Sequence, residues 1–311
     1  MKLYKINGRT LEKVVNDPFK LEKDIQELVE GNTRTLFGLE FVRSEFSVDN
    51  FRIDTLCFDP ESRSFTIIEY KKDKNFSVID QGYTYLSLLL NNKAEFILEY
   101  NELTEQTLKR GDVDWSQSRV IFISPRYTSY QKHSVNFKDV PFELWEIYKY
   151  KNGTIGLTKH EADSDVKIDS TSSGSSESVM KSVSKEVKVY DEEYHLTKNK
   201  NRPPEIEELY YKIKERILDL GDDIDIKYLA QTIQFKVQRS IVDLIVYNSG
   251  VIAIINMKQG QLDDPRSETK DLSEKGHWGN GDYKYKFTPG EELEYGIYLI
   301  KQSYEARKLD E

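Results

Sequence analysis

Two carboxylates and a lysine stand at the ends of two neighbouring apolar segments. Asp54 lies in the first segment, and Glu69 and Lys71 close the second. A short polar turn of the kind that closes a hairpin separates them at residues 59–64. If the two strands pair, the three side chains converge at one end of a sheet. Two carboxylates can hold a hard divalent cation, and a lysine beside them can orient a water. These are the groups that metal-assisted phosphodiester hydrolysis requires.

Strand acids also have a structural interpretation. Burying an unpaired charge is costly, so Asp54 and Glu69 could instead be strand-end residues that face solvent or pair with Arg52 and Lys71. The two strands alone do not decide between these interpretations. The spacing of Glu69 and Lys71 favours the functional one, because residues two apart in a strand share a face. Gln81 is followed four residues later by a tyrosine in the next helical pattern, so both can face the sheet.

The elements that would position these residues follow from hydrophobic periodicity. A helix is predicted after Pro18 and another at 78–91, and strands are predicted at 36–46, 50–58, 64–71, 94–99, 120–123 and 142–148. Helix, strands, helix and further strands in this order predict an α/β domain around a mixed sheet flanked by helices. Two more acids could join the cluster: Glu27 on the first helix, or Glu45 near the end of the preceding strand.

The ordered set of residues resembles the PD-(D/E)XK nuclease superfamily, whose members are metal-dependent phosphodiesterases with a restriction-endonuclease-like fold. The pattern is Glu, then Asp, then Glu-x-Lys, then Gln-x-x-x-Tyr. Roughly residues 20–125 supply it, as Glu27 or Glu45, Asp54, Glu69-Tyr70-Lys71, and Gln81 with Tyr85. The Arg52-Ile53-Asp54 context is most similar to the branch of RecB-type nuclease domains and mismatch-cleaving endonucleases. Ile53 stands where the pattern has proline, a position that varies widely in the superfamily.

The resemblance implies a mechanism and a substrate. Asp54 and Glu69 would bind Mg²⁺ or Mn²⁺ together with the backbone carbonyl of Tyr70. Lys71 would orient the attacking water or offset charge in the transition state. Gln81 would fix that water or Lys71, and Tyr85 would contact the phosphate or brace its helix. The expected function is a metal-dependent endonuclease acting on DNA, in repair or in defence against foreign DNA. The alternative is a non-catalytic nucleic-acid-binding or adaptor protein on the same fold.

Composition divides the chain into parts. The 311 residues are enough for two domains, and nine serines lie between Ser164 and Ser184. This predicts an N-terminal nuclease-like domain at 1–160, a flexible Ser-rich linker at 161–188, and a smaller α+β domain at 189–311. The C-terminal part resembles an uncharacterised domain found at the ends of other prokaryotic proteins, on the segments 262–266 and 276–283. We expect it to serve recognition or dimerisation.

Charge and hydropathy bound the environment of the protein. The net charge is −9, which argues against a uniformly basic surface but allows a local basic region. The single cysteine, Cys57, excludes an intrachain disulfide and a cysteine-based zinc site. No apolar run approaches the roughly 20 residues that a membrane-spanning helix needs. We therefore expect a cytoplasmic protein with no membrane partner. By analogy with nucleases that cut both strands, a homodimer is a further expectation.

Overall fold

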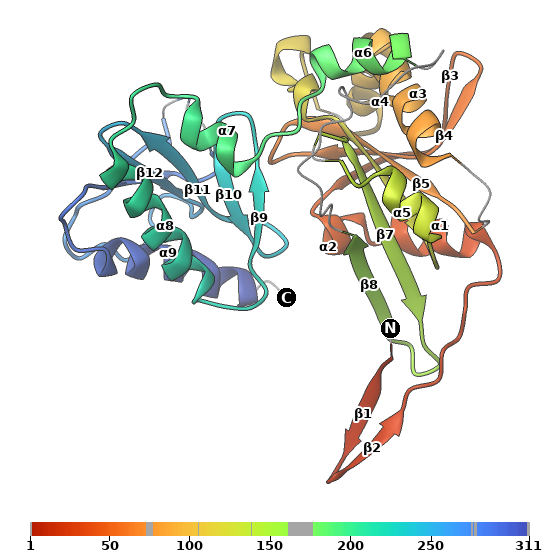
Figure 1. Cartoon of the computed structure of the whole chain (residues 1–311), viewed down its shortest axis with the longest axis horizontal. Coiled ribbons are helices and arrows are strands. Elements are labelled where there is room, and N and C mark those ends of the chain that lie inside the picture. Colours follow the sequence, from red (N-terminus) through yellow and green to blue (C-terminus); the bar gives the residue numbers. More distant parts are fainter. Residues whose placement is uncertain are drawn as a thin grey trace. The chain divides into compact units, whose positions relative to one another are not determined.

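The chain forms two compact units, Met1–Val189 and Tyr190–Glu311 (Figure 1). The computed structural model describes residues 2–72, 77–104, 106–137, 139–160, 177–274, 276 and 279–309. None of the described helices has both the length and the apolarity needed to cross a membrane.

The first unit is built on a six-stranded mixed sheet in the order β3-β4-β5-β6-β7-β8. The first three strands form an antiparallel meander, β5, β6 and β7 run parallel, and β8 returns antiparallel to β7. The strands are β3 (Glu40–Val48), β4 (Phe51–Asp59), β5 (Ser64–Tyr70), β6 (Arg119–Ser124), β7 (Phe142–Lys149) and β8 (Ile155–His160). The predicted α/β fold with a mixed sheet is confirmed.

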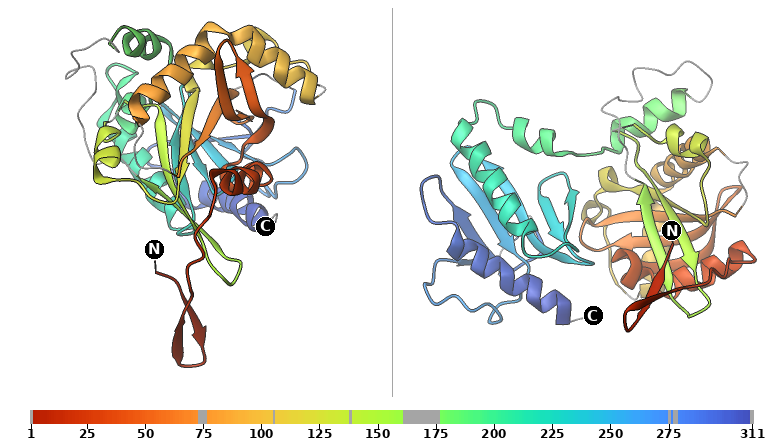
Figure 2. Two further views of the ribbon diagram at one scale, coloured as in Figure 1. Left: turned by 90° about the vertical axis from the view of Figure 1, so that its right-hand side faces the viewer. Right: turned by 60° about the horizontal axis from the view of Figure 1, so that its bottom comes forward.

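Helices cover both faces of this sheet (Figures 1 and 2). On one face, α1 (Glu22–Glu30) and α2 (Thr33–Phe37) pack residues such as Ile25 and Val29 against Ile68. The other face is covered by α3 (Val78–Asn91), α4 (Lys93–Thr104), α5 (Ser129–Ser134) and α6 (Glu177–Glu186). Strand residues alternate between the two cores because successive side chains point to opposite faces.

The predicted strand at 94–99 is wrong, because these residues belong to helix α4. Phe96 and Tyr100 are four residues apart and both are buried in the core beneath the helix. A short apolar run does not separate a strand from one side of a helix, and here the spacing of four is the deciding feature. The predicted strand at 36–46 also begins later, at Glu40, because Thr33–Phe37 forms helix α2.

Only the last part of the predicted linker at 161–188, residues 177–188, can be compared with the structure. Residues 161–176 lie outside the described residues. Residues 177–186 form α6, and Met180 and Val183 of this helix, with Val187 directly after it, are buried in the core of the first unit. The prediction of a flexible linker is wrong for this part. The three apolar residues recur at intervals of three and four, which is the spacing of one helical face.

The second unit is a six-stranded antiparallel sheet in the order β13-β14-β12-β11-β10-β9. Helices α8 and α9 pack against this sheet and share one hydrophobic core with it. This confirms a smaller α+β domain. Its elements are α7 (Glu192–Thr197), α8 (Pro204–Leu218), β9 (Asp225–Tyr228), β10 (Ile233–Lys236), β11 (Ser240–Tyr247), β12 (Gly250–Ile255), β13 (Lys270–Asp271), β14 (Tyr283–Phe287) and α9 (Glu294–Leu309). His277 and Trp278, in the segment that carries its sequence resemblance, lie outside the described residues.

Helix α3 approaches the sheet closely at Gly82. A Cβ atom added there would lie 2.5 Å from the ring of Phe142, which is held edge-on by Tyr83 and Phe122. We expect Gly82→Ala to destabilise the protein by about 1–3 kcal/mol, because overpacking outweighs the gain of about 1 kcal/mol in helix propensity. Urea unfolding would measure it. Gly111→Ala, where a Cβ has open space, is the matched control. A stabilised Gly82→Ala variant would contradict the expectation.

Candidate active site

The paired strands β4 and β5 bring the predicted acids together. Thr55 lies opposite Ile68 in the antiparallel register, so the next positions, Asp54 and Glu69, also face each other. Asp54 Oδ2 accepts a hydrogen bond of 3.1 Å from the backbone N–H of Tyr70. Glu69 lies on the same side of β5 as Phe65 and Ile67, which face helix α3. The site therefore lies between the end of β5 and the start of α3.

Glu69 is the centre of the hydrogen-bonding network. The residue is 2% exposed, and its Oε1 accepts from Lys71 Nζ at 2.6 Å and from Gln81 Nε2 at 2.8 Å. The Gln81 amide also lies 3.1 Å from the Tyr85 hydroxyl, which reaches the Arg52 carbonyl at 3.5 Å. Helix α3 begins at the N-cap Ser77, whose hydroxyl accepts from the backbone N–H of Asp80. This start places Gln81 and Tyr85 one turn apart over Glu69.

The other carboxylate oxygen, Glu69 Oε2, is buried and has no hydrogen-bond partner among the described residues. A buried polar atom without a partner is costly, and most such atoms in folded proteins are satisfied by protein, water or an ion. The unpartnered oxygen belongs to an acid that already faces a second acid, Asp54. Excess negative charge and an unsatisfied acceptor are the properties of a site that takes up a cation.

The environment of Asp54 strongly disfavours its ionised form. Burial, and after it repulsion by the neighbouring Glu69 carboxylate, raises the pKa of Asp54 from 3.8 to about 7. The hydrogen bond from Tyr70 N–H and the charge of Lys71 oppose this rise, while Glu45 adds to it. A cation bound between two partly buried carboxylates would offset both their mutual repulsion and the cost of their burial. Burial also raises the pKa of Tyr85, so its phenol stays protonated near neutral pH.

Of the two predicted third acids, the structure brings Glu45 to the cluster and not Glu27. Glu45 holds the register position across from Asp54, between the pairs Ser44–Thr55 and Phe46–Ile53. Its Oε2 forms an ion pair of 2.7 Å with Arg52 Nε. Glu27 lies on the outer side of α1, where its side chain is 67% exposed and pairs with Lys23 at 3.8 Å.

Within the described ranges, no group of three or more His, Cys, Asp or Glu side chains is arranged to hold a metal ion. Asp54 and Glu69 supply two carboxylates, so a complete coordination sphere would need neutral oxygens as well. A backbone carbonyl and waters are common ligands of Mg²⁺, which usually retains several waters. The two carboxylates and the unpartnered Glu69 Oε2 are compatible with such a site.

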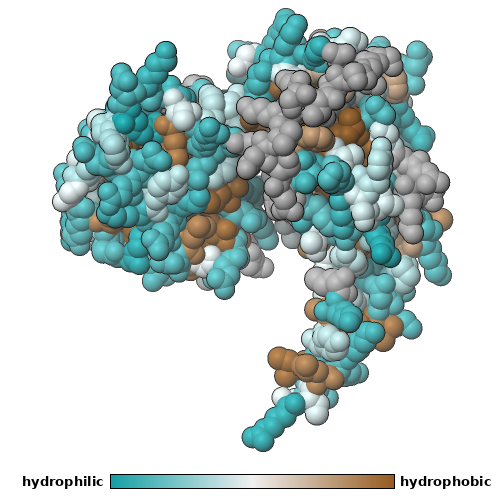
Figure 3. Space-filling model, viewed as in Figure 1, coloured by the Kyte–Doolittle hydropathy of each residue, from teal (hydrophilic) through white to brown (hydrophobic). Residues whose placement is uncertain are grey.

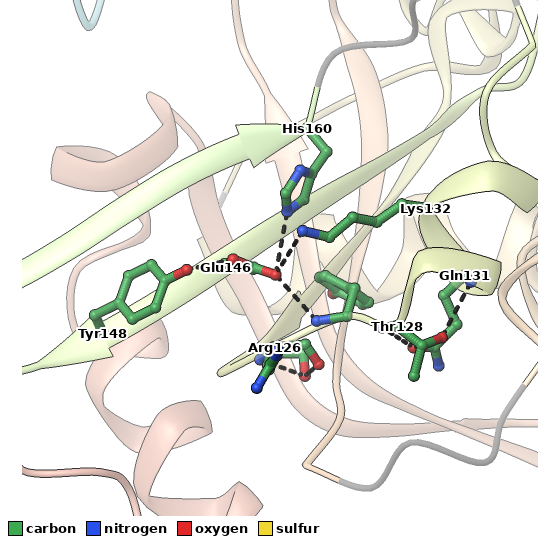
Figure 4. Close-up of polar contacts among 9 residues, drawn as sticks. Arg126, Thr128, Gln131, Lys132, Glu146, Tyr148 and His160 are labelled. Atoms are coloured by element: carbon green, nitrogen blue, oxygen red, sulfur yellow. Dashed lines mark hydrogen bonds and ion pairs between the residues drawn. The ribbon is translucent and has the colours of Figure 1, made fainter. Parts of the chain in front are cut away.

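A second buried carboxylate lies on β7, at the same edge of the sheet. Glu146 is 6% exposed, and its Oε1 accepts from the backbone N–H of Tyr127 at 3.1 Å and pairs with Lys132 Nζ at 3.0 Å (Figure 4). His160 Nε2 lies 3.3 Å from the same oxygen, and the Tyr148 hydroxyl donates to Oε2. The network ties the chain segment after β6 and helix α5 to β7.

Glu146 is held in its ionised form. Burial alone would raise its pKa, but hydrogen bonds from the Tyr148 hydroxyl, the Tyr127 N–H and Lys132 lower it to about 2. Glu146 follows Leu144 by two residues and so shares its face, and Leu144 is aligned with Phe122 and, through it, with Glu69. The two carboxylate clusters therefore lie on one face and one edge of the sheet, two strands apart.

One relative shares nearly the whole chain. A protein from Haemophilus influenzae, described as uncharacterized, is 45% identical over 306 residues, which cover 97% of this chain and 99% of that protein. The chain belongs to the family of that protein. No protein-family model matches the chain.

Two solved structures each match part of the present chain. A repair endonuclease from Pyrococcus abyssi matches with 16% identity and a TM-score of 0.22, covering 38% of this chain and 44% of that chain. The structure of EndoMS in complex with double-stranded DNA matches with 14% identity and a TM-score of 0.22, covering 43% and 59%. The matched region thus spans about half the length of each of these proteins.

Sequence reasoning missed three polar residues around the cluster, although the signals were present. Gln26 and Glu30 flank the buried stripe of α1. The Gln26 amide lies 3.1 Å from the Asp54 carbonyl, and Glu30 accepts from Thr55 Oγ1 at 2.6 Å. Helical periodicity would have placed both toward the sheet and Glu27 outward. Glu146 could have been found from strand alternation, because it shares the inward parity of Phe142 and Leu144.

Proposed function

We propose that this protein is a metal-dependent nuclease that hydrolyses phosphodiester bonds in DNA. The observation that carries the proposal is the buried, unpartnered Glu69 Oε2 beside Asp54, with Lys71 and Gln81 on the other oxygen. A purely structural Glu-Lys pair does not require a second acid held at a raised pKa. The choice of DNA as substrate rests on the resemblance of the ordered residues to the PD-(D/E)XK pattern.

In this proposal Asp54, Glu69 and the Tyr70 carbonyl hold Mg²⁺ or Mn²⁺. A divalent ion there would polarise a phosphate oxygen and lower the pKa of a water. Lys71, fixed at 2.6 Å from Glu69, orients that water and offsets charge that develops on the phosphorus oxygens. Gln81 holds the Glu69 carboxylate in place, and Tyr85 holds Gln81.

The nearby Glu146 cluster has a positioning role in the same proposal. By anchoring the Tyr127 backbone and Lys132, Glu146 fixes the start of α5 at the edge where the substrate would lie. Lys132 keeps 37% of its side chain exposed, so it remains accessible to a phosphate. Charge-assisted contacts to phosphates position the backbone of a nucleic acid without reading its sequence.

The test uses the wild-type chain and Glu69→Gln with supercoiled plasmid, linear duplex and single-stranded DNA. We expect cleavage by the wild type with Mg²⁺ or Mn²⁺, none with EDTA, and a loss of about 10³-fold or more in Glu69→Gln. Isothermal titration with Mn²⁺ gives a readout that does not depend on finding the right substrate. The variant is expected to lose measurable Mn²⁺ binding.

Glu27→Gln is the matched control, because it makes the same chemical change at an exposed acid away from the cluster. It should bind Mn²⁺ and cleave like the wild type. Absence of Mn²⁺ binding by the wild type, together with no cleavage of any DNA, would reject the nuclease. Nucleic-acid binding under those conditions would then favour a non-catalytic binding protein on this fold.

A further inference from the structure

A β-hairpin projects from the first unit with all of its strand residues exposed (Figures 1 and 2). Strands β1 (Tyr4–Asn7) and β2 (Thr10–Lys13) pair antiparallel through a two-residue turn, Gly8-Arg9. Gly8 has a φ of +60°, which the first position of such a turn requires and which glycine adopts without strain. We call residues 2–15 the arm.

The arm exposes apolar side chains, and an isolated hairpin with such side chains would be only marginally ordered in water. Ile6 and Leu11 lie directly opposite each other, on the same face as Tyr4. Their exposed fractions are 75%, 68% and 47%, and Figure 3 shows hydrophobic side chains standing on the arm. An isolated two-stranded hairpin is marginally stable in water. The exposed face therefore calls for a partner that covers it.

The positive charge of the arm indicates which class of partner would bind it. The arm carries four cations, Lys2, Lys5, Arg9 and Lys13, against one anion, Glu12, in a chain whose net charge is −9. Arg9 lies at the tip, where the turn puts it furthest from the body of the unit. A basic arm on an acidic protein is complementary to a polyanion. It is adapted to this partner more than to a large apolar interface.

The base of the arm lies at the edge of the sheet that carries the candidate active site. Asp17 N–H donates to the Lys149 carbonyl at 2.8 Å, and Lys151 N–H donates to the Val15 carbonyl at 2.9 Å. These contacts join the arm to the carboxyl end of β7. Because β5, β6 and β7 run parallel, their carboxyl ends form one edge, which also holds Glu69.

The greatest possible reach of the arm is comparable to one turn of a DNA duplex. From the level of Glu146 to the tip at Gly8 the chain spans roughly a dozen extended residues, so at most about 40 Å. One turn of B-form DNA is about 34–36 Å. A duplex bound at the candidate site would therefore present a groove within reach of the arm. A two-stranded ribbon also fits the width of the major groove.

We propose that the arm binds duplex DNA in the major groove next to the nuclease site. The proposal rests on the proposed function, because that function places the duplex at this edge. Arg9 enters the groove, Lys5 and Lys13 contact backbone phosphates, and the Ile6–Leu11 face covers sugar and thymine methyl surface. The arm extends the footprint of the protein along the duplex and fixes the register of the site.

The test compares Lys5→Ala/Arg9→Ala/Lys13→Ala with the wild-type chain, by fluorescence anisotropy on a 30-base-pair duplex in EDTA. We expect the triple variant to bind at least about 10-fold more weakly at low salt. The slope of log K against log salt should fall by about 2–3, since each lost phosphate contact contributes about 0.9. The melting temperature should stay within about 1 °C of wild type, because the arm is outside both cores.

The matched control is Lys23→Ala/Lys212→Ala/Lys301→Ala. It removes the same charge from three exposed lysines, each of which forms an ion pair within a helix and none of which belongs to the arm. Its affinity should stay within about twofold of wild type. Equal weakening by both triple variants would overturn the proposal, because it would leave only an effect of net charge. A wild-type chain that binds duplex no better than the arm variant would overturn it too.

A second measurement separates DNA binding from self-association. Sedimentation of the wild type and of the arm variant Ile6→Ala/Leu11→Ala should give the same mass, while the variant binds duplex more weakly. A dimer that dissociates in this variant, with DNA binding unchanged, would overturn the proposal in favour of a dimerisation arm. Arm-dependent binding without metal-dependent cleavage would reject the nuclease alone. Cleavage without arm-dependent binding would reject the arm alone.

Discussion

Asp54→Asn is expected to abolish cleavage and, at the same time, to stabilise the folded protein above neutral pH. Asparagine keeps an oxygen that can accept from the Tyr70 N–H but removes the charge that a divalent ion requires. Loss of that ion should lower the cleavage rate by about 10³-fold or more. Few substitutions at a buried polar position stabilise a protein, so the two effects together identify a residue kept for function.

The stabilisation follows from the direction of the pKa shift. Burial, and then repulsion by Glu69, raises the folded-state pKa of Asp54 from 3.8 to about 7. Between these values the folded chain holds a proton that the unfolded chain has released, so stability falls as the pH rises through this window. Asparagine carries no charge and escapes this loss. A shift of this size corresponds to an upper limit of about 4 kcal/mol, so the gain should reach about 2 kcal/mol or more at pH 8 and stay below about 1 kcal/mol at pH 4.

Thermal melts in EDTA at pH 4 and pH 8 would measure the difference, with about 5 °C expected at pH 8. Glu45→Gln is the matched control, since Glu45 is more exposed and is paired with Arg52. It should give no gain at pH 8. An Asp54→Asn protein that is less stable than wild type at pH 8, or that still cleaves DNA, would contradict the assignment of Asp54 as a functional acid.

The same shift predicts how metal binding varies with pH. Since Asp54 is largely protonated below pH 7, an ion must displace that proton. Mn²⁺ affinity should therefore rise as the pH increases from 6 to 8, with a proton released on binding near pH 6. Calorimetry in buffers of different ionisation enthalpy would count that proton. An affinity independent of pH would place the ion elsewhere.

The sequence predicted the pairing of the motif strands because local signals agreed there. The turn at residues 59–64, the alternation of the strands and the spacing of Glu69 and Lys71 all pointed to one hairpin. Tertiary contacts decided the points at which prediction failed. Residues 94–99 form a helix because Phe96 and Tyr100 fill the core above β3 and β4. Short apolar runs carry no information about which of these packings is available.

The choice of the third acid also depended on tertiary packing that the sequence does not show. Nothing in the spacing of Glu27 and Glu45 relative to Asp54 decides between them, because the distance depends on the packing of α1. Once Ile25 and Val29 face the sheet, Glu27 must point outward. The arm was also missed, although Gly8-Arg9 between alternating residues is a hairpin signal with glycine at the first position of the turn. A hairpin without a core contact has no second sequence feature that confirms it.

Lys71→Met is expected to separate the chemistry from the binding of the ion. Lys71 Nζ lies 2.6 Å from Glu69 Oε1, and the Lys71 side chain is 21% exposed. It can therefore reach a phosphate that binds at the surface beside the site. Methionine fills a similar volume without the charge. Removal of one preorganised group that stabilises developing charge typically lowers kcat by about 10²–10³-fold. We expect that loss in cleavage, with Mn²⁺ affinity equal to or above that of wild type.

The reason is that Lys71 and a divalent ion are alternative counter-charges for one buried carboxylate. Without lysine, Glu69 keeps the hydrogen bond from Gln81 but loses its ion pair, and the metal-free protein should lose about 1–3 kcal/mol of stability. Adding Mn²⁺ should then raise the melting temperature of Lys71→Met more than that of wild type. A lysine that serves the fold alone would lower stability equally with and without the ion.

Lys72→Met provides the comparison, because Lys72 is the next residue and its Nζ contacts the Lys20 carbonyl, not the Glu69 carboxylate. It should cleave within about threefold of wild type and show the wild-type response to Mn²⁺. If Lys71→Met also cleaved within about threefold of wild type, Lys71 would have no role in the mechanism, and the Glu69–Lys71 pair would be structural. A larger Mn²⁺ response together with lost cleavage fits only a lysine that shares its carboxylate with the ion.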